Sequence, residues 1–443
     1  MPPLDTRLLQ ALTPWLGAPR WRLALSGGLD SSVLLHLLVG LGRAHRLPPL
    51  QAIYVHHGLQ AAAEAWPAHC QRLCDALGVP LRVERVQVAP GASLERAARE
   101  ARYRALARDL EPGELVLTAQ HRDDQAETLL FRLLRGAGAR GLAAMPVQRA
   151  LGRGVLVRPL LAVSRAELLA YAQAQGVPWV EDPSNADSHY ARNYLRREVL
   201  PRLSERWPQA VAGLARSAAH LGEAQGLLAE LAELDLARAR DDGTSIFPGF
   251  TLPSLALAPL LELSAARQRN ALSQWLVALT PLPDTDHWQG WIDLRDAARD
   301  KQPIWRLGRG ELRRADGRLW WLSGEWLQAP PMPADGLPVV APGAWFELPG
   351  NGRVQLLGDG PLEGLSLRYR QGGEQLQLPG RGRRDLKRLL NERAVPSFVR
   401  ARLPLLYRGS QLVAVANLAQ LSRADEPGWQ LSWHGPTNEQ GLS

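Results

Sequence analysis

The chain has 443 residues, a formal net charge of +8 at pH 7 and 46% hydrophobic residues. Because folded domains hold roughly 100 to 200 residues, this length predicts two to four globular domains, each with its own core. No apolar run reaches the ~18 residues of a membrane span, and the opening MPPLDTRLLQ lacks the pattern of a signal peptide, so we expect a cytoplasmic protein without a membrane partner.

The first half of the chain alternates short apolar segments with longer segments of helical periodicity. The predicted strands are Trp21–Leu25, Leu50–Val55, Leu81–Val88, Glu114–Thr118 and Val155–Leu160. The predicted helices are Ser31–Leu41, Ala61–Leu77, Leu94–Leu110 and Asp124–Leu134. Strands separated by helices imply right-handed crossovers and a mainly parallel sheet covered on both faces. Ligands bind such sheets beyond the carboxyl ends of the strands.

Polar segments follow three of these strands. They are Ser26-Gly27-Gly28-Leu29-Asp30-Ser31, His56-His57-Gly58, and the run from Gln120 to Glu127. A glycine turn between a strand and a helix offers backbone N–H groups and the positive end of the helix dipole to an anion. This turn lacks the lysine of a Walker loop and adds a carboxylate instead. Two interpretations stay open: Asp30 and Ser31 cap the helix, or Asp30 holds Mg²⁺ against a bound polyphosphate.

The acidic residues Asp123, Asp124 and Glu127 allow the same pair of interpretations. Carboxylates at the start of a helix are favoured by its dipole, and they would also serve a metal or a substrate if they faced the glycine turn. The cysteines Cys70 and Cys74 lie one turn apart in a predicted helix. We therefore expect neither a disulfide nor a zinc site there.

From Pro201 onward the pattern becomes helical, rich in leucine and alanine as far as Arg240. Further helical segments are predicted at Ala265–Leu279 and Trp288–Ala298. The segment Trp305–Trp326 has strand and turn character, with a turn at Asp316-Gly317. This region predicts a second, mainly helical domain.

A proline-rich stretch from Ala329 to Pro333 predicts a linker. Beyond it, strands at Leu365–Tyr369 and Gln411–Val415 accompany a basic helix near Asp385–Glu392, which predicts a small third α/β domain. Between Arg381 and Arg402, eight basic residues stand against two acidic ones. This run is either a solvated helix face or a phosphate-contact surface.

The segment from Ser26 to Ser31 matches the SGGxDS signature of the PP-loop, or N-type, ATP pyrophosphatases. Within that superfamily the chain resembles the tRNA(Ile)-lysidine synthetases. The similar blocks are His56-His57-Gly58, Thr118 to Thr128, Arg135 to Leu142, Arg158-Pro159-Leu160-Leu161, Glu181 to Asn185, Arg192-Asn193, Arg370 to Glu374 and Pro404-Leu405-Leu406. One departure is Gln120, where the family more often carries a second histidine.

The resemblance implies an α/β fold that begins with a parallel-sheet PP-loop domain, similar to the adenine nucleotide alpha hydrolases, over residues 1–205. A mainly helical tRNA-substrate-binding domain over residues 206–328 and a C-terminal α/β tRNA-binding domain over residues 345–435 would follow. The oligomeric state stays open between monomer and homodimer.

The reaction that the resemblance implies has two steps. The C2 carbonyl oxygen of the wobble cytidine, position 34 of a tRNA(Ile) with the anticodon CAU, attacks the α-phosphate of ATP and pyrophosphate leaves. The ε-amine of free L-lysine then attacks C2 and expels AMP. The product, lysidine, changes codon specificity from AUG to AUA.

The resemblance also assigns residues. ATP would bind at Ser26, Gly27, Gly28, Leu29, Asp30, Ser31 and His56. Asp30 and Asp124 would hold Mg²⁺, and together with Glu127 they would be catalytic, since the lysine ammonium must lose a proton before it can attack. The substrate and tRNA contacts would be His121, Arg192, Asn193, Arg383, Arg384, Lys387 and Arg388.

Three other functions compete with this one. A tRNA thiolase would need reactive or cluster-binding cysteines, and a PP-loop amidotransferase would need a source of ammonia. A non-catalytic RNA-binding module would have little use for carboxylates at two strand ends.

Overall fold

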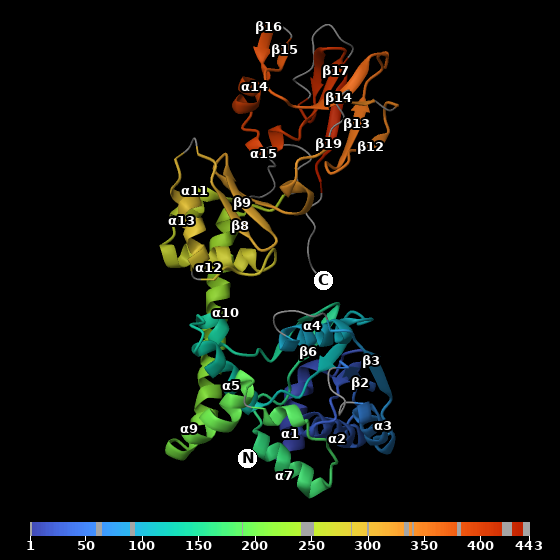
Figure 1. The fold of residues 1–443 in the computed structure, drawn as a ribbon, viewed down its shortest axis with the longest axis vertical. Helices are drawn as coiled ribbons and strands as arrows, with labels where there is room; N and C mark the ends of the chain where they lie inside the picture. The colour runs from blue at the N-terminus through green and yellow to red at the C-terminus, as the bar shows by residue number, and fades with distance from the viewer. Residues whose placement is uncertain are drawn as a thin grey trace. The chain divides into compact units, whose positions relative to one another are not determined.

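The computed structural model describes residues 2–58, 64–88, 94–187, 189–240, 252–284, 286–298, 301–331, 336–338, 341–378, 382–418 and 428–436. The chain forms two compact units, residues 1–227 and 228–443, which are described here one at a time (Figure 1). No helix in these ranges is long and apolar enough to cross a membrane.

The first unit is built on a six-stranded sheet with the strand order β3-β2-β1-β4-β6-β5. Its strands are β1 (Trp21–Ala24), β2 (Leu50–His56), β3 (Leu81–Arg85), β4 (Leu115–Leu117), β5 (Gln148–Leu151) and β6 (Gly154–Val157). All neighbouring strands are parallel except β5 and β6. The predicted parallel sheet is confirmed, and β5 is an edge strand that the sequence patterns did not reveal.

The strand order places a topological switch beside β1. From β1 the chain moves outward through β2 to β3 and then returns to β4 on the other side of β1. In open α/β sheets the crevice at such a switch, beyond the carboxyl ends of the strands, binds the ligand. The two segments that meet there are the glycine turn after β1 and the polar run after β4.

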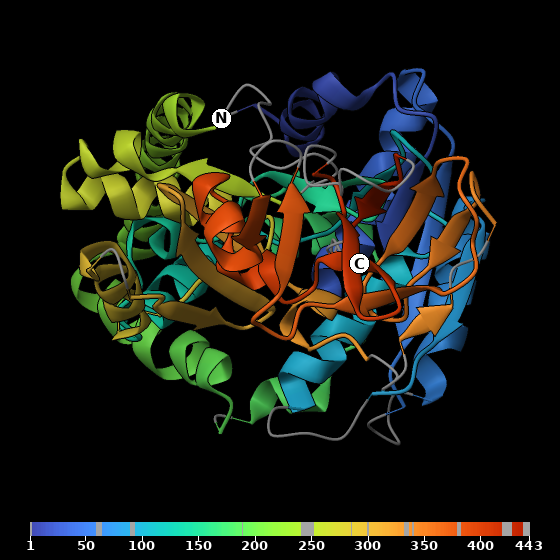
Figure 2. The same cartoon turned by 90° about the horizontal axis from the view of Figure 1, so that it is seen from above.

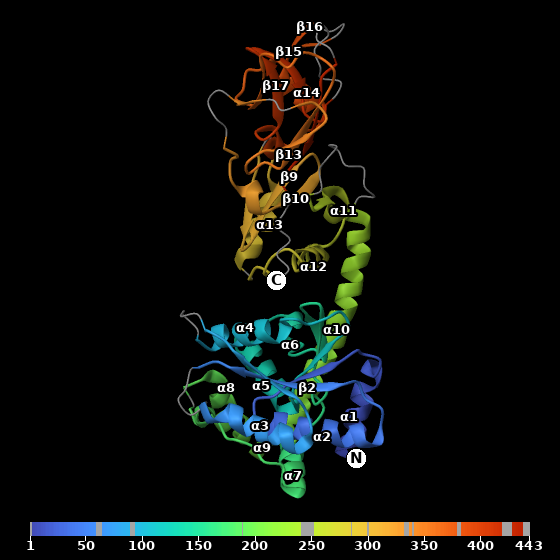
Figure 3. The same cartoon turned by 90° about the vertical axis from the view of Figure 1, so that its right-hand side faces the viewer.

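Helices cover both faces of this sheet (Figure 3). On one face, α1 (Leu4–Leu12), α2 (Leu29–Ala44), α3 (Trp66–Leu77) and α7 (Arg165–Gln175) bury leucines against Leu23 and Leu117. On the other, α4 (Leu94–Ala107) buries Leu106 against Val116. The two buried faces explain why these strands read as nearly continuous apolar runs.

Smaller helices complete the first unit. They are α5 (Arg122–Leu133), α6 (Ala139–Leu142), α8 (Ala191–Tyr194), a π-helical turn (Leu195–Val199), α9 (Leu200–Arg206) and the start of α10 (Ala210–Ala239). Ala218 of α10 packs against Leu129 of α5 and Ala144. These contacts fix α5, which carries the acidic residues, within the unit.

The second unit begins with helices and an antiparallel sheet. Its helices α11 (Leu257–Leu261), α12 (Ala265–Leu276) and α13 (Gln289–Asp296) pack on the strands in the order β7 (Ser254–Ala256), β10 (Arg318–Leu322), β9 (Gly310–Ala315) and β8 (Ile304–Leu307). The predicted second domain is therefore not clearly mainly helical, because a four-stranded antiparallel sheet accompanies these helices. The cause is the alternating segment from Ile304 to Leu322, whose three strands are joined by short turns, including the predicted one at Asp316-Gly317, where both φ angles are positive.

The C-terminal part of this unit is largely β-sheet (Figures 1 and 2). One sheet has the order β11 (Leu337–Pro338), β14 (Leu365–Tyr369), β17 (Pro404–Arg408) and β18 (Gln411–Val415), and a second has β12 (Trp345–Glu347), β13 (Arg353–Leu357) and β19 (Gln430–His434). A hairpin, β15 (Gln375–Leu378) and β16 (Gly382–Asp385), precedes the short helices α14 (Leu386–Glu392) and α15 (Ser397–Arg400). The paired strands are antiparallel, and the predicted α/β domain is largely β-sheet with two short helices.

Candidate active site

The glycine turn after β1 has the shape of an anion cradle. Gly27 has φ +78°, and a Cβ there would lie 3.0 Å from Cys70 Sγ, so only glycine fits both the conformation and the space. The Val180 N–H donates to the Gly27 carbonyl at 2.9 Å, which fixes the turn. Gly28 is then the N-cap residue of α2.

The two serines of the turn support each other. The Ser26 N–H donates to Ser31 Oγ at 3.2 Å, and the Ser31 hydroxyl donates to the Gly28 carbonyl at 3.1 Å. No side chain caps the N-terminus of α2. The interpretation of Asp30 and Ser31 as cap residues is therefore wrong, and the positive end of α2 stays available to an anion.

Asp30 and Asp124 meet at one imidazole. His121, which is 1% exposed, has Nε2 3.6 Å from Asp30 Oδ2 and 3.6 Å from Asp124 Oδ2. Burial lowers the pKa of His121, but the carboxylates of Asp123, Asp30 and Asp124 outweigh it and raise the pKa to about 10. The imidazolium thus carries a positive charge between carboxylates from two strand ends.

Asp123 has a different task from its neighbour. Its Oδ2 accepts the Arg165 N–H at 2.9 Å, which ties the start of α5 to the start of α7, and lies 3.6 Å from His121 Nδ1. Asp124 Oδ2 accepts the N–H of His121 at 3.0 Å and closes the first turn of α5. Asp124 faces Asp30, whereas Asp123 positions the helix.

Arg196 completes the acidic group, and the sequence analysis missed it. From the π-helical turn after α8, its Nε donates to Glu127 Oε1 at 2.6 Å, while its Nη2 donates to Glu127 Oε2 and to Asp124 Oδ1, both at 3.0 Å. Burial raises the pKa of Glu127, and the Arg196 guanidinium opposes that rise. The only local signal for Arg196 was the block Arg192-Asn193 one helical turn earlier.

The two histidines at the end of β2, His56 and His57, contact other residues than these carboxylates. His56 is buried, with Nε2 3.5 Å from Glu64 Oε1. His57 lies beside Arg102, and burial together with that guanidinium lowers the pKa of His57 to about 4. Gln120, the departure from the family pattern, accepts the Thr118 hydroxyl through Oε1 at 2.5 Å.

Arg192 and Asn193 differ in their environment. The Asn193 amide donates to the carbonyls of Ser184 and Asp187, each at 2.8 Å, so it holds the loop of the Glu181 to Asn185 block in place. Arg192 is half-buried, and no ion pair joins it to another residue in the described ranges. Asn193 therefore supports the loop of the site in this structure, and the Arg192 guanidinium could pair with a bound anion.

The basic run in the second unit is only partly a surface. Arg383 and Arg384 on β16, and Lys387 and Arg388 on α14, are exposed, and Arg388 pairs with Glu392 at 3.2 Å. Arg402, which we included in the run, is 3% exposed and donates to the Gly350 carbonyl at 2.9 Å, so its inclusion was wrong. Arg381 lies outside the described residues.

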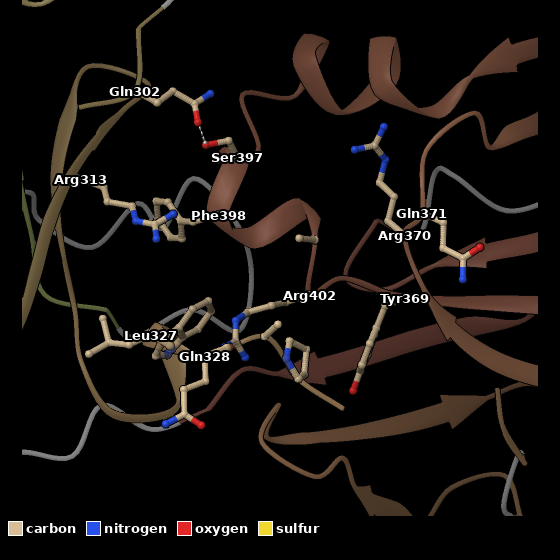
Figure 4. A pocket seen from close by; sticks show the side chains of 14 residues that line it. Gln302, Arg313, Leu327, Gln328, Tyr369, Arg370, Gln371, Ser397, Phe398 and Arg402 are labelled. Carbon is tan, nitrogen blue, oxygen red and sulfur yellow. Dashed lines mark hydrogen bonds between the residues drawn. The ribbon is translucent and has the colours of Figure 1, made fainter. Parts of the chain in front are cut away.

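A cavity of about 440 Å³ lies beside this run (Figure 4). Arg370 and Gln371 of the block Arg370 to Glu374 line it. Glu374 accepts the N–H groups of Gln371 and Gly372 at 2.5 and 2.6 Å, and its Oε2 lies 3.2 Å from Arg370 Nε. The block therefore builds a loop that presents its arginine and glutamine at the cavity.

Two further observations bear on the chemistry. No group of three or more histidines, cysteines or acids suited to a metal occurs in the described ranges, so a cation here would be held by two carboxylates and the substrate.

Cys70 and Cys74 are free and buried, and burial raises the pKa of Cys70 to about 12 and that of Cys74 to about 11. Such thiols are inert, which opposes thiolase chemistry.

Comparison with family models divides the chain into three matches. A PP-loop domain matches residues 2–203, a TilS substrate binding domain matches residues 255–320, and a TilS substrate C-terminal domain matches residues 365–433.

Curated relatives match over the full length. The tRNA(Ile)-lysidine synthase of Pseudomonas aeruginosa is 62% identical over 442 residues, which cover 100% of this chain and 99% of the relative. That of Pseudomonas putida is 63% identical over 432 residues, covering 98% and 99%. Among solved structures, a U34-tRNA thiolase from Methanococcus maripaludis is 16% identical, with a TM-score of 0.40, and the match covers 49% of this chain and 78% of that one.

Proposed function

The chain belongs to the tRNA(Ile)-lysidine synthase family, and we propose below which of its residues perform the reaction. It is an ATP-dependent ligase that forms lysidine at the wobble cytidine. The observation that carries the assignment is the meeting of Asp30 and Asp124 at His121, beside the glycine turn. ATP binds in the PP-loop domain.

The glycine turn would hold the departing pyrophosphate. Hydrogen bonds among the Ser26 N–H, the Ser26 and Ser31 hydroxyls and the Gly28 carbonyl fix the turn, and its backbone N–H groups from Ser26 to Gly28 would be the donors together with the two hydroxyls. Donors that are already in place stabilise negative charge as it develops, without reorganisation. Leu29 and His56, the other residues of the proposed ATP site, are both buried and would shape its walls.

Asp30 and Asp124 fit a magnesium ion. The Oδ1 atom of Asp30 is buried and has no hydrogen-bond partner in the described structure, and Mg²⁺ is typically held by one or two carboxylates together with substrate phosphates. When bound, the ion would offset the negative charge of the phosphates. His121 would keep the two carboxylates oriented through its ring nitrogen.

Asp124 and Glu127 would receive the ε-ammonium of L-lysine. An amine with a pKa near ~10.4 is almost fully protonated at neutral pH, so it must be held as a cation and then deprotonated. Arg196 pairs with both carboxylates by donating to each of them, and its guanidinium opposes the rise that burial causes in the pKa of Glu127. The pair would therefore attract the ammonium and could accept its proton as the nitrogen attacks C2 and AMP leaves.

The other parts of the chain would bind the tRNA(Ile) with the CAU anticodon. We propose domains at residues 1–205, 206–328 and 345–435, with Arg383, Arg384, Lys387 and Arg388 as phosphate contacts of the last one. His121 and Arg192 would lie near the cytidine. An unpaired base in an anticodon loop enters a pocket at modest cost, and because tRNA and ATP are cytoplasmic we place the reaction in the cytoplasm.

The experiment that tests this proposal uses the full chain with ATP, Mg²⁺, labelled lysine and total tRNA. We expect label in tRNA with one AMP released per label, and label only in the tRNA(Ile) with the CAU anticodon. Incorporation of sulfur, or release of AMP without label, would contradict the proposal.

A further inference from the structure

Two arginines of the first unit lie against one tyrosine ring. On α4, the Arg99 guanidinium carbon is 4.9 Å from the centre of the Tyr103 ring, and Arg99 Nη2 donates to the Tyr103 hydroxyl at 3.1 Å. The Arg149 guanidinium carbon, on β5, is 4.4 Å from the same centre. Planar guanidinium groups stack on aromatic rings in this way and keep their N–H groups free for an anion.

A third arginine adds to the charge. Arg158, at the end of β6, is 3% exposed; its Nη1 donates to the Pro146 carbonyl at 2.7 Å, and its Nε is buried without a hydrogen-bond partner in the described ranges. Burial lowers the pKa of Arg158; the Tyr103 hydroxyl opposes this shift, and the charges of Arg149 and Arg99 add to it.

None of these three arginines has a counter-charge in the described part of the chain. Every ion pair of α4 and of the β5–β6 hairpin that the structure records joins other residues, such as Arg96 with Glu100 and Arg153 with Glu111. Like charges gathered without carboxylates repel one another in the free protein. An arrangement of this kind is stabilised when an anion binds.

The cluster lies at the catalytic edge of the sheet. Arg158 directly follows β6. Tyr103 packs against the same hydrophobic core as Ala24 and Val55, which lie at the carboxyl ends of β1 and β2. The glycine turn and the polar run after β4 start from the same edge. A ligand of this cluster would therefore reach the site at which the cytidine reacts.

We propose that Arg99 and Arg149, stacked on Tyr103 with the buried Arg158 adding to their positive charge, bind backbone phosphates of the tRNA beside the reacting cytidine. The inference rests on the proposed function and gives the first unit its own contact with the RNA backbone. We favour tRNA over ATP because the glycine turn already offers a cradle to the nucleotide phosphates, and because Arg99 is exposed. Phosphate contacts of this kind position an RNA without reading its sequence.

The test compares two double variants of the full chain. R99Q/R149Q removes two charges of the cluster, and the matched control R104Q/R153Q removes two charges from the same helix and the same hairpin, outside the cluster. Each lost contact to a single-stranded region lowers the salt slope of log K by about 0.7. We expect R99Q/R149Q to lower the slope by about 1.4 and to weaken tRNA binding roughly tenfold at 0.15 M salt, with an unchanged KM for ATP.

The control variants and the affinity for tRNA decide between these possibilities. R104Q/R153Q should bind tRNA within about twofold of the wild type, and R99K/R149K, which keeps the charges, should retain the wild-type salt slope. An R99Q/R149Q protein with a wild-type melting temperature that binds tRNA as well as the control would overturn the inference, as would a raised KM for ATP with unchanged tRNA affinity. A wild-type enzyme that formed no lysidine would instead contradict the proposed function.

Discussion

Replacing Arg196 by methionine should destabilise the protein in a way that depends on pH. Arg196 donates to both oxygens of Glu127, whose residue is 2% exposed. Without the guanidinium, the buried carboxylate escapes its desolvation penalty by taking up a proton. Against an ordinary value of 4.5, keeping that proton costs about 1.36 kcal/mol for each pH unit. The loss from Glu127 is then at most about 3.4 kcal/mol at pH 7 and about 1.4 kcal/mol at pH 5.5.

The sign follows from the protons bound in each state. In R196M the native state keeps a proton that the unfolded chain releases above its ordinary pKa, so stability falls as the pH rises from 5.5 to 7. Urea unfolding in Mg²⁺-free buffer at both pH values measures this change. The double variant R196M/E127Q should lose the pH dependence, and R197M, the exposed neighbour in the same turn, should change little. An R196M loss that is equal at the two pH values, or no larger than that of R197M, would refute the reasoning.

Three other changes test separate parts of the structure. G27A should lower the melting temperature and impair ATP turnover, because its Cβ would lie 3.0 Å from Cys70 Sγ at a φ of +78°. The control G28A, with a φ of −76° and 3.5 Å from its Cβ to the nearest atom, should melt within a few degrees of the wild type. Equal melting temperatures of the two variants would contradict the packing argument. Replacing Arg383, Arg384 and Lys387 by glutamine should weaken tRNA binding and reduce its salt slope by about 0.7 to 0.9 per contact. R388Q, which removes a partner of Glu392, should reduce the slope less. Unchanged affinity and slope would show that this basic run is a solvated surface and does not contact phosphates. At pH 8, Cys70 should react with thiol reagents about a thousandfold more slowly than a free thiol, and Cys74 about a hundredfold more slowly. The reason is that their pKa values are about 12 and about 11, against 9.0 for a free thiol. Rapid labelling of the folded protein would show that the two thiols are not buried.

The local signals in the sequence predicted the catalytic half of the fold well. The strand at Trp21, the glycine turn and the helix after it follow one another within 24 residues of chain from Trp21 to Ala44, so apolar periodicity and turn chemistry were sufficient to find them. The short edge strand β5 was missed because its polar residues Gln148 and Arg149 interrupt the apolar pattern. The alternating segment from Ile304 to Leu322 carried a strand signal, and the helices before it led us to give that signal too little weight.

Long-range ion pairs were beyond the reach of sequence reasoning. Arg196 lies 69 residues from Glu127 in the chain, and nothing near either residue marks the other as its partner. The meeting of Asp30 with Asp124 could be expected, since both follow strands on either side of the switch. The buried His121 between them, and the buried position of Arg402, depend on packing that only the folded chain defines.

The central claim is that Asp30 holds a cation against the phosphates of ATP, and the assay of D30A tests it most directly. Wild-type enzyme and D30A are given ATP, Mg²⁺, labelled lysine and the tRNA(Ile) with the CAU anticodon, and AMP release and label in tRNA are measured together. We expect D30A to fold normally and to lose at least about a hundredfold of both products, as when one group that stabilises developing charge is removed. Undiminished turnover in D30A would contradict the account.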